Sequence, residues 1–185
     1  MNQISLTTPV LFDKGSREMA TVLSSRLDWL DNAYGKAERR VEQVDEVAYS
    51  FPAVPVGIKE YLRLMPDDSL GNFCFFDFVD PAAIDRQSKH LVRASSLCGV
   101  VFWGDLRSVY PSDAANRTLE NVKREVLSVL EQYSTPTTRF SVQSIAERAE
   151  NIYPGYTARE LHNQYLMRPY FGFRINGLMT VSQNC

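Results

Sequence analysis

Four aspartates lie close enough together in the chain to suggest metal-dependent chemistry. Asp77 and Asp80 are three positions apart, and Asp85 and Asp105 follow them. Nucleases and phosphatases hold Mg²⁺ with carboxylates of this kind. Within a strand, however, residues three apart point to opposite faces, so Asp77 and Asp80 converge only if the strand ends between them, where Pro81 follows. We favour a turn and a solvated loop over a metal site.

The other signals for catalysis are incomplete. His90 and His162 are far apart and have no cysteine or carboxylate at the spacing of zinc ligands. Gly99 and Gly104 have the glycine spacing of a phosphate-binding loop, but Asp105 stands where that loop needs a lysine. We therefore expect no catalytic residue, no metal site, no cofactor and no enzyme activity.

Length and composition favour one folded domain over residues 1–185, with 44% hydrophobic and 23% charged residues. The net charge is -2, from 20 basic and 22 acidic residues, so the chain has no basic excess for neutralising phosphates and little affinity for DNA is expected. The densest basic group is followed at once by acidic residues, which predicts a solvated helix end or loop. The members are Lys36, Arg39, Arg40, Glu42, Asp45 and Glu46.

Cysteine usage and apolar runs indicate the cell interior. Cys74, Cys98 and Cys185 form no C-x-x-C pair, and the first two lie in apolar runs, where a thiol acts as a small hydrophobic group. Residues 1–12 lack the basic start and apolar stretch of a secretory signal. No apolar run approaches the roughly 20 residues that span a bilayer.

Two helices are predicted from apolar spacing of three or four residues. After an extended segment to residue 12 and a turn at 13–15, the first helix runs from its N-cap, Ser16, to about Tyr34, with Gly35 as its terminator. The second covers 116–133 and ends near Pro136. Their apolar stripes are Met19, Leu23, Leu27, Leu30 and Tyr34, and Leu119, Val122, Val126, Val129 and Tyr133.

The remaining segments predict strands. They are 47–54, stopped by Pro52 and Pro55, then 60–65, 73–79, 97–103 and 170–181. The apolar runs at 73–79 and 97–103 are expected at the centre of the sheet, covered on both faces. Residues 139–150 are compatible with strand or helix, and we favour a strand. A turn at 153–156, a capping box at 157–160 and a short helix with Leu161 and Tyr165 precede the last strand. The fold class is α+β: a mostly antiparallel sheet of four to six strands with two amphipathic helices on one face.

Three stretches together resemble a known family. They are RLDWLD at 26–31, GVVFW at 99–103, and ENIYPGY at 150–156 leading through YLMRPY at 165–170 to FRI at 173–175. This arrangement resembles head–tail joining and tail-completion proteins of tailed bacteriophages, particularly small tail-terminator-like proteins of phages and prophages of the Bacteroides group. The resemblance covers most of the chain and is strongest in its C-terminal third.

The resemblance implies a structural virion protein, made in the host bacterial cytoplasm and built into the tail or neck. Such subunits commonly form a hexameric ring that caps the tail tube and contacts neck or connector proteins. DNA passes through the ring without being gripped. The family supplies no catalytic residue.

The connection before the last strand is the predicted protein interface, because tyrosine and arginine are enriched at interfaces. Phe171, Phe173 and Ile175 should fill the subunit's own core. The alternative is that the tyrosines of the connection pack onto their own subunit. The interface residues are Tyr153, Tyr156, Tyr165, Arg168 and Tyr170.

Two other functions stay open at this point. One is a Mg²⁺-dependent nuclease or phosphatase that uses Asp77, Asp80 and Asp105. The other is a monomeric adaptor domain that binds other proteins.

Overall fold

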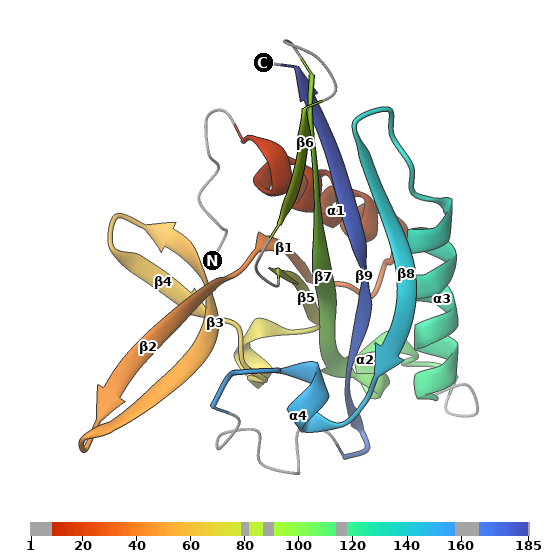
Figure 1. Ribbon diagram of the computed structural model, residues 1–185. Coiled ribbons are helices and arrows are strands. Elements are labelled where there is room, and N and C mark those ends of the chain that lie inside the picture. The colour runs from red at the N-terminus through yellow and green to blue at the C-terminus, as the bar shows by residue number, and fades with distance from the viewer. Residues whose placement is uncertain (1–8, 79–81, 87–90, 114–117, 158–166, 185) are drawn as a thin grey trace.

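The chain forms a six-stranded sheet with a smaller three-stranded sheet beside it. The computed structural model describes residues 9–78, 82–86, 91–113, 118–157 and 167–184 (Figure 1). The large sheet has the order β1-β5-β7-β9-β8, with β6 also paired to β7. Its strands are β1 (Asn32–Lys36), β5 (Phe73–Phe78), β6 (Ala83–Arg86), β7 (Leu91–Asp105), β8 (Thr138–Ala146) and β9 (Tyr170–Asn184).

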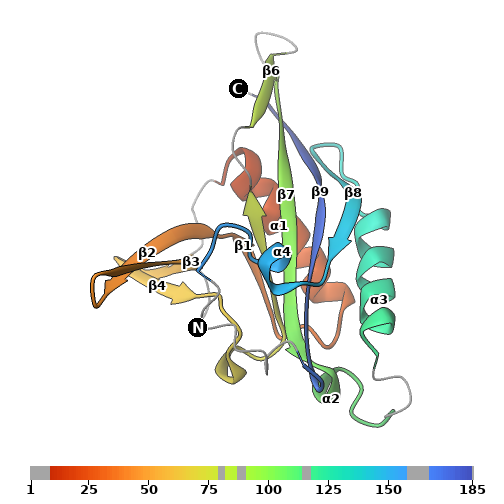
Figure 2. The same cartoon turned by 60° about the horizontal axis from the view of Figure 1, so that its bottom comes forward.

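The small sheet has the order β2-β3-β4 and was not predicted as a separate unit. Its strands are β2 (Glu38–Val44), β3 (Val47–Gly57) and β4 (Glu60–Arg63). In both views it projects from one side of the large sheet as an arm (Figures 1 and 2). All strand pairs are antiparallel except β1 with β5, so the predicted α+β class with a mostly antiparallel sheet is confirmed.

The first helix, α1 (Leu11–Arg26), begins earlier and ends earlier than predicted. The turn predicted at 13–15 is helical, because Gly15 lets α1 lie against β9. A Cβ atom there would stand 2.8 Å from Val181 Cγ2. Ser16 is not an N-cap: it is buried, and its Oγ accepts a hydrogen bond from the Lys36 amide at 3.1 Å. Tyr34 lies in β1, where its burial continues the apolar spacing beyond the end of the helix.

The helix α3 (Leu119–Gln132) confirms the second predicted helix. Thr118 caps it by accepting from the Asn121 amide at 3.3 Å. Its buried positions Val122, Val126 and Leu130 join the core that α1 also enters. The two long helices therefore cover the same face of the large sheet, as predicted (Figure 2).

The opposite face of the sheet is covered by the root of the arm and by the one-turn helix α4 (Ala149–Ile152) with the turn after it. The central strands are consequently buried on both faces over most of the predicted runs: residues 73–76 of β5 and 98–104 of β7 are buried, whereas Leu97 is exposed. The predicted core residues Phe171, Phe173 and Ile175 are buried as well. Cys74 and Cys98 are free, buried thiols.

Two prolines do not stop β3, contrary to prediction. The Pro52 carbonyl accepts from the Leu64 amide at 2.8 Å, on the side where β4 has already ended, so its missing amide hydrogen breaks no ladder bond. Pro55 lies beside an irregularity in the β3–β4 register, a position where proline is tolerated.

Residues 138–146 form β8, which confirms the preferred strand assignment. The turn at 153–156 is also present. Most of the predicted capping box and the short helix after it lie outside the described residues. No helix within the described ranges is long and apolar enough to cross a membrane.

Candidate interaction surface

The candidate carboxylates do not meet in the structure. Asp77 lies opposite Gly99, whereas Asp105 lies six residues further along β7, a separation of roughly 20 Å at about 3.3 Å per residue. Asp85 is exposed on β6, and Asp80 lies outside the described residues. Across the described part of the chain, no group of three or more His, Cys, Asp or Glu residues could hold a metal ion. His90 and His162 lie outside it.

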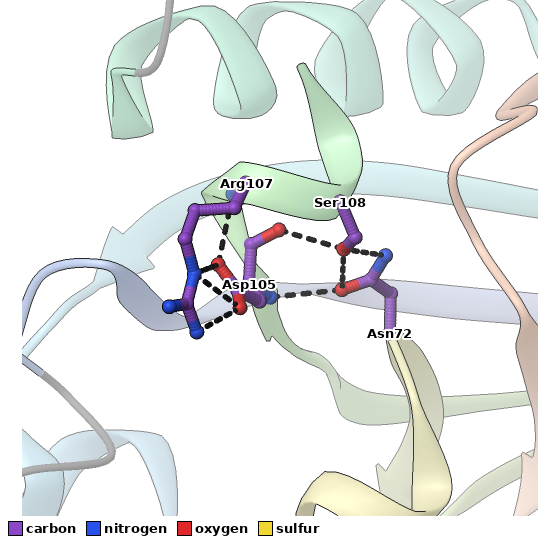
Figure 3. A network of polar contacts seen from close by, with 4 residues as sticks. All are labelled: Asn72, Asp105, Arg107 and Ser108. Atoms are coloured by element: carbon purple, nitrogen blue, oxygen red, sulfur yellow. Dashed lines mark hydrogen bonds and ion pairs between the residues drawn. The ribbon is translucent and has the colours of Figure 1, made fainter. Parts of the chain in front are cut away.

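Asp105 organises the junction between β7 and the short helix α2 (Leu106–Val109), as Figure 3 shows. Its Oδ1 accepts from the Arg107 amide at 2.8 Å, and its Oδ2 pairs with Arg107 Nη2 at 2.6 Å. Its own amide donates to Asn72 Oδ1 at 2.8 Å, and Asn72 Nδ2 donates to Ser108 Oγ at 2.9 Å. Gly104 belongs to this junction, because a Cβ atom there would stand 2.4 Å from Asn72 Oδ1. The second glycine of the apparent phosphate loop is therefore a close-packing position inside β7.

Asp77 is buried in β5 rather than in a solvated turn, which corrects the sequence-based interpretation. Arg174 of β9 reaches across β7, and its Nη1 pairs with Asp77 Oδ2 at 2.5 Å. The path crosses Gly99, where a Cβ atom would stand 2.1 Å from Arg174 Cζ. Arg174 Nε donates to Asn176 Oδ1 at 2.7 Å, so the guanidinium is held from two sides. Three strands thus share one buried ion pair.

Tyr156 completes this network from the turn after α4. Its hydroxyl donates to Asp77 Oδ1 at 2.8 Å. Burial, and then the charge of Asp77, raise the pKa of Tyr156 above its ordinary value, so the phenol remains a neutral donor. On the outer side, the Arg39 guanidinium lies over the Tyr156 ring at 4.9 Å from its centroid. The buried pair is therefore connected to the surface through one tyrosine.

The predicted interface residues have different environments. Tyr153 is 2% exposed and packs against Phe75 at a centroid distance of 6.2 Å, so its assignment to an intersubunit contact is corrected: it belongs to its own subunit's core. Tyr170 is half-buried and stacks on Trp103 at 5.4 Å. Arg168 is exposed, and Tyr165 lies outside the described residues. The prediction for Tyr156, Arg168 and Tyr170 stays a prediction.

The arm is a surface feature that the sequence did not reveal. Among the described residues, ten large hydrophobic side chains are exposed, and half of them lie on the arm. Two arginine–aromatic pairs accompany them: Arg40 lies over Tyr61 at 3.5 Å, and Arg63 over Phe51 at 4.4 Å. Aromatic and arginine side chains with exposed apolar neighbours are typical of protein interfaces. The five exposed hydrophobic residues are Val41, Val44, Val47, Ile58 and Tyr61.

The basic group in this region lies on strands rather than on a helix end or loop, which corrects the prediction. Arg39 and Arg40 belong to β2, and Lys36 ends β1. The sequence pattern for a strand is weak here, because β2 reads ERRVEQV and its polar residues occupy both faces of the strand. An exposed arm needs no alternating apolar pattern, since neither face of its outer part is buried.

No protein-family model matches the chain, and no curated protein matches it.

Proposed function

We propose that this protein is a structural virion protein of a tailed phage, a tail-terminator or neck-ring subunit that joins the tail to the head. The observation that carries the proposal is the projecting β2-β3-β4 arm with its concentration of exposed apolar side chains. A subunit of a closed ring needs two different surfaces, one that is offered to the next subunit and one that receives the previous one. An arm on a compact body supplies the first of these.

The charge of the chain supports a role beside DNA without tight binding to it. A protein that grips DNA neutralises several phosphates with clustered lysine and arginine. This chain carries a net charge of -2. One arginine of the arm, Arg40, is also engaged: it pairs with Glu38 at 3.3 Å and lies over Tyr61. A ring of such subunits would let DNA pass.

The hydrolase alternative is weaker on geometric grounds. Asp77 in β5 lies opposite Gly99, six residues along β7 from Asp105, and each aspartate already contacts an arginine, Arg174 and Arg107 respectively. A two-carboxylate metal site needs both groups within reach of one ion. The adaptor alternative also uses the arm as a protein-binding surface. It differs from the ring hypothesis because it does not place the chain in phage particles.

The test is to locate the chain in particles of a phage that encodes it. Purified particles should contain the protein at a fixed copy number, and electron cryomicroscopy should show its density as a ring at the tail-to-head junction. The same lysate depleted of particles serves as the control. If the chain remains in the depleted lysate and is absent from particles, the proposal is wrong and the adaptor function is favoured.

A further inference from the structure

A pocket of about 620 Å³ lies at the root of the arm, between the end of β5 and the start of β2. Phe12, Phe78 and Tyr156 give it aromatic walls. Lys36 and Arg39 stand at these walls, with Lys36 Nζ 5.8 Å from the centroid of Phe78 and Arg39 over Tyr156. Both cations are exposed. The pocket therefore offers apolar surface bordered by two positive charges.

The two carboxylates that line the pocket do not cancel these charges. Asp77 is paired with the buried Arg174, and Glu38 is paired with Arg40. Within the described part of the chain, Lys36 and Arg39 have no carboxylate partner. An occupant that brings both apolar side chains and carboxylates would complement the pocket.

The tip of the arm has this composition. Val44 and Val47 pair across the end of the hairpin and are 45% and 40% exposed. Asp45 and Glu46 form the two-residue turn between them, and both are exposed. Glu42, two residues before Val44 in β2, adds a third carboxylate. Apolar and acidic groups thus occupy the end of the β2–β3 hairpin.

The turn itself is built against its conformational preference. Asp45 has φ 47° and Glu46 has φ 65°, the left-handed region that a type I′ two-residue hairpin turn requires at both positions. Asn-Gly or Asp-Gly is the favoured pair, because a Cβ atom in this region costs about 1–2 kcal/mol. Strained non-glycine residues of this kind cluster at functional positions. A function of its carboxylate therefore explains Glu46 better than the conformation of the turn does.

We propose that the tip of the arm, residues 44–47, docks into the pocket at the arm root of a second copy of this chain. The tip cannot reach its own pocket, because Lys36 and Asp45 are nine residues apart along an extended chain, or roughly 30 Å. Tip and pocket are different surfaces, so the contact is head-to-tail, and repeated contacts of this kind close into a ring when the rotation permits. The inference rests on the proposed function, since it supplies the receiving surface that a ring subunit needs.

Cysteine crosslinking between two different variants tests the contact. Lys36→Cys in one chain and Glu46→Cys in the other, both with Cys185→Ser, are mixed as full-length proteins and mildly oxidised. Burial raises the pKa of both remaining thiols, Cys74 and Cys98, which keeps them unreactive. In a matched control, Glu131→Cys on α3 replaces Glu46→Cys. The yield of the peptide crosslinked between positions 36 and 46 should exceed the yield of the control crosslink by at least about tenfold, a preference of about 1.4 kcal/mol. Equal yields overturn the proposal.

Charge reversal gives an independent measurement. Asp45→Lys with Glu46→Lys should abolish association in sedimentation analysis, as should Lys36→Glu with Arg39→Glu, and mixing the two reversed proteins should restore it. Glu131→Lys, on the exposed face of α3, is the control and should associate like the unaltered chain. Association unchanged in either double variant refutes the docking.

The two proposals fail in different ways. If particles contain the chain but the 36–46 crosslink does not exceed its control, the docking contact is wrong and the virion function stands. If the crosslink forms while the chain is absent from particles, the contact is right and the virion function is wrong.

Discussion

Removal of the buried guanidinium is the sharpest test of how the molecule is held together. Arg174→Met keeps most of the side-chain volume but takes away the cation that contacts Asp77, a residue only 6% exposed. Breaking a buried ion pair in this way costs about 3–5 kcal/mol, because the remaining charge stays desolvated. For a chain of this length, 1 kcal/mol shifts the melting temperature by about 2–4 °C, so Arg174→Met should lower it by roughly 6–20 °C.

A double-mutant cycle isolates the interaction free energy of the Arg174–Asp77 pair. Asp77→Leu alone should cost a similar amount, because it leaves Arg174 buried without its carboxylate. The combination of both substitutions should cost much less than their sum, since an apolar pair leaves no buried charge. Urea denaturation of the four proteins, followed by circular dichroism, should give a coupling free energy of at least about 2 kcal/mol.

Two further variants make the result specific. Gly99→Ala should reproduce much of the loss, because its Cβ atom would occupy the place of the Arg174 guanidinium. Arg139→Met, at an exposed position on the neighbouring strand β8, is the control and should stay within about 0.5 kcal/mol of the unaltered protein. Stability within 1 kcal/mol of the unaltered chain for Arg174→Met, or additive single effects, would refute the reasoning.

Four other outcomes are expected. Glu46→Gly should raise the free energy of unfolding by about 0.5–1 kcal/mol in urea titrations, since the relief of left-handed strain outweighs the added freedom of the unfolded chain; a loss of stability would contradict the strain. Arg168→Glu should leave thermal unfolding nearly unchanged yet prevent incorporation into particles, whereas Phe173→Ala should destabilise the fold by roughly 3–5 kcal/mol; normal particles with Arg168→Glu would remove that residue from the interface. Burial, and then the charge of Glu18, raise the pKa of Tyr133 to about 12 from an ordinary value near 10. Between these values the folded state binds more protons, so stability should fall as pH rises from about 10 to 12, and Tyr133→Phe should make this fall shallower; an unchanged slope would exclude Tyr133 as its source. Binding of duplex DNA at about 150 mM salt should be weaker than micromolar in an anisotropy titration, and submicromolar affinity would contradict the charge argument.

The parts of the fold that the sequence predicted are those whose burial follows a local pattern. The aromatic run in β5 indicated a strand covered on both faces, and the apolar residues at every second position of β9 indicated a strand with that face in the core. The apolar stripe of α3 lies within one short segment and could be recognised without knowledge of the rest, whereas its cap at Thr118 was not predicted. In each case the residues that fix the structure are close in sequence.

The parts that were missed depend on contacts between distant segments. The spacing of apolar residues from Met19 to Tyr34 continues past the end of α1. The turn after the helix and the parallel strand β1 also bury apolar side chains, so the helical pattern does not stop where the helix does. Arg174, Gly99 and Asp77 are separated by up to 97 positions, and no local pattern relates them. The free energy lost by burying Asp77 is compensated only when β5, β7 and β9 lie side by side and Arg174 can reach it.

The buried network and the proposed docking pocket are parts of one arrangement. Tyr156 donates to Asp77 on its inner side and carries the Arg39 guanidinium on its ring on the outer side. The position of a pocket cation therefore depends on a carboxylate that is itself held by Arg174 across β7. A hydrophobic replacement of the pair could preserve stability, but it would remove the acceptor that orients Tyr156. We infer that the ion pair is better explained by the geometry it imposes at the root of the arm than by the stability it adds.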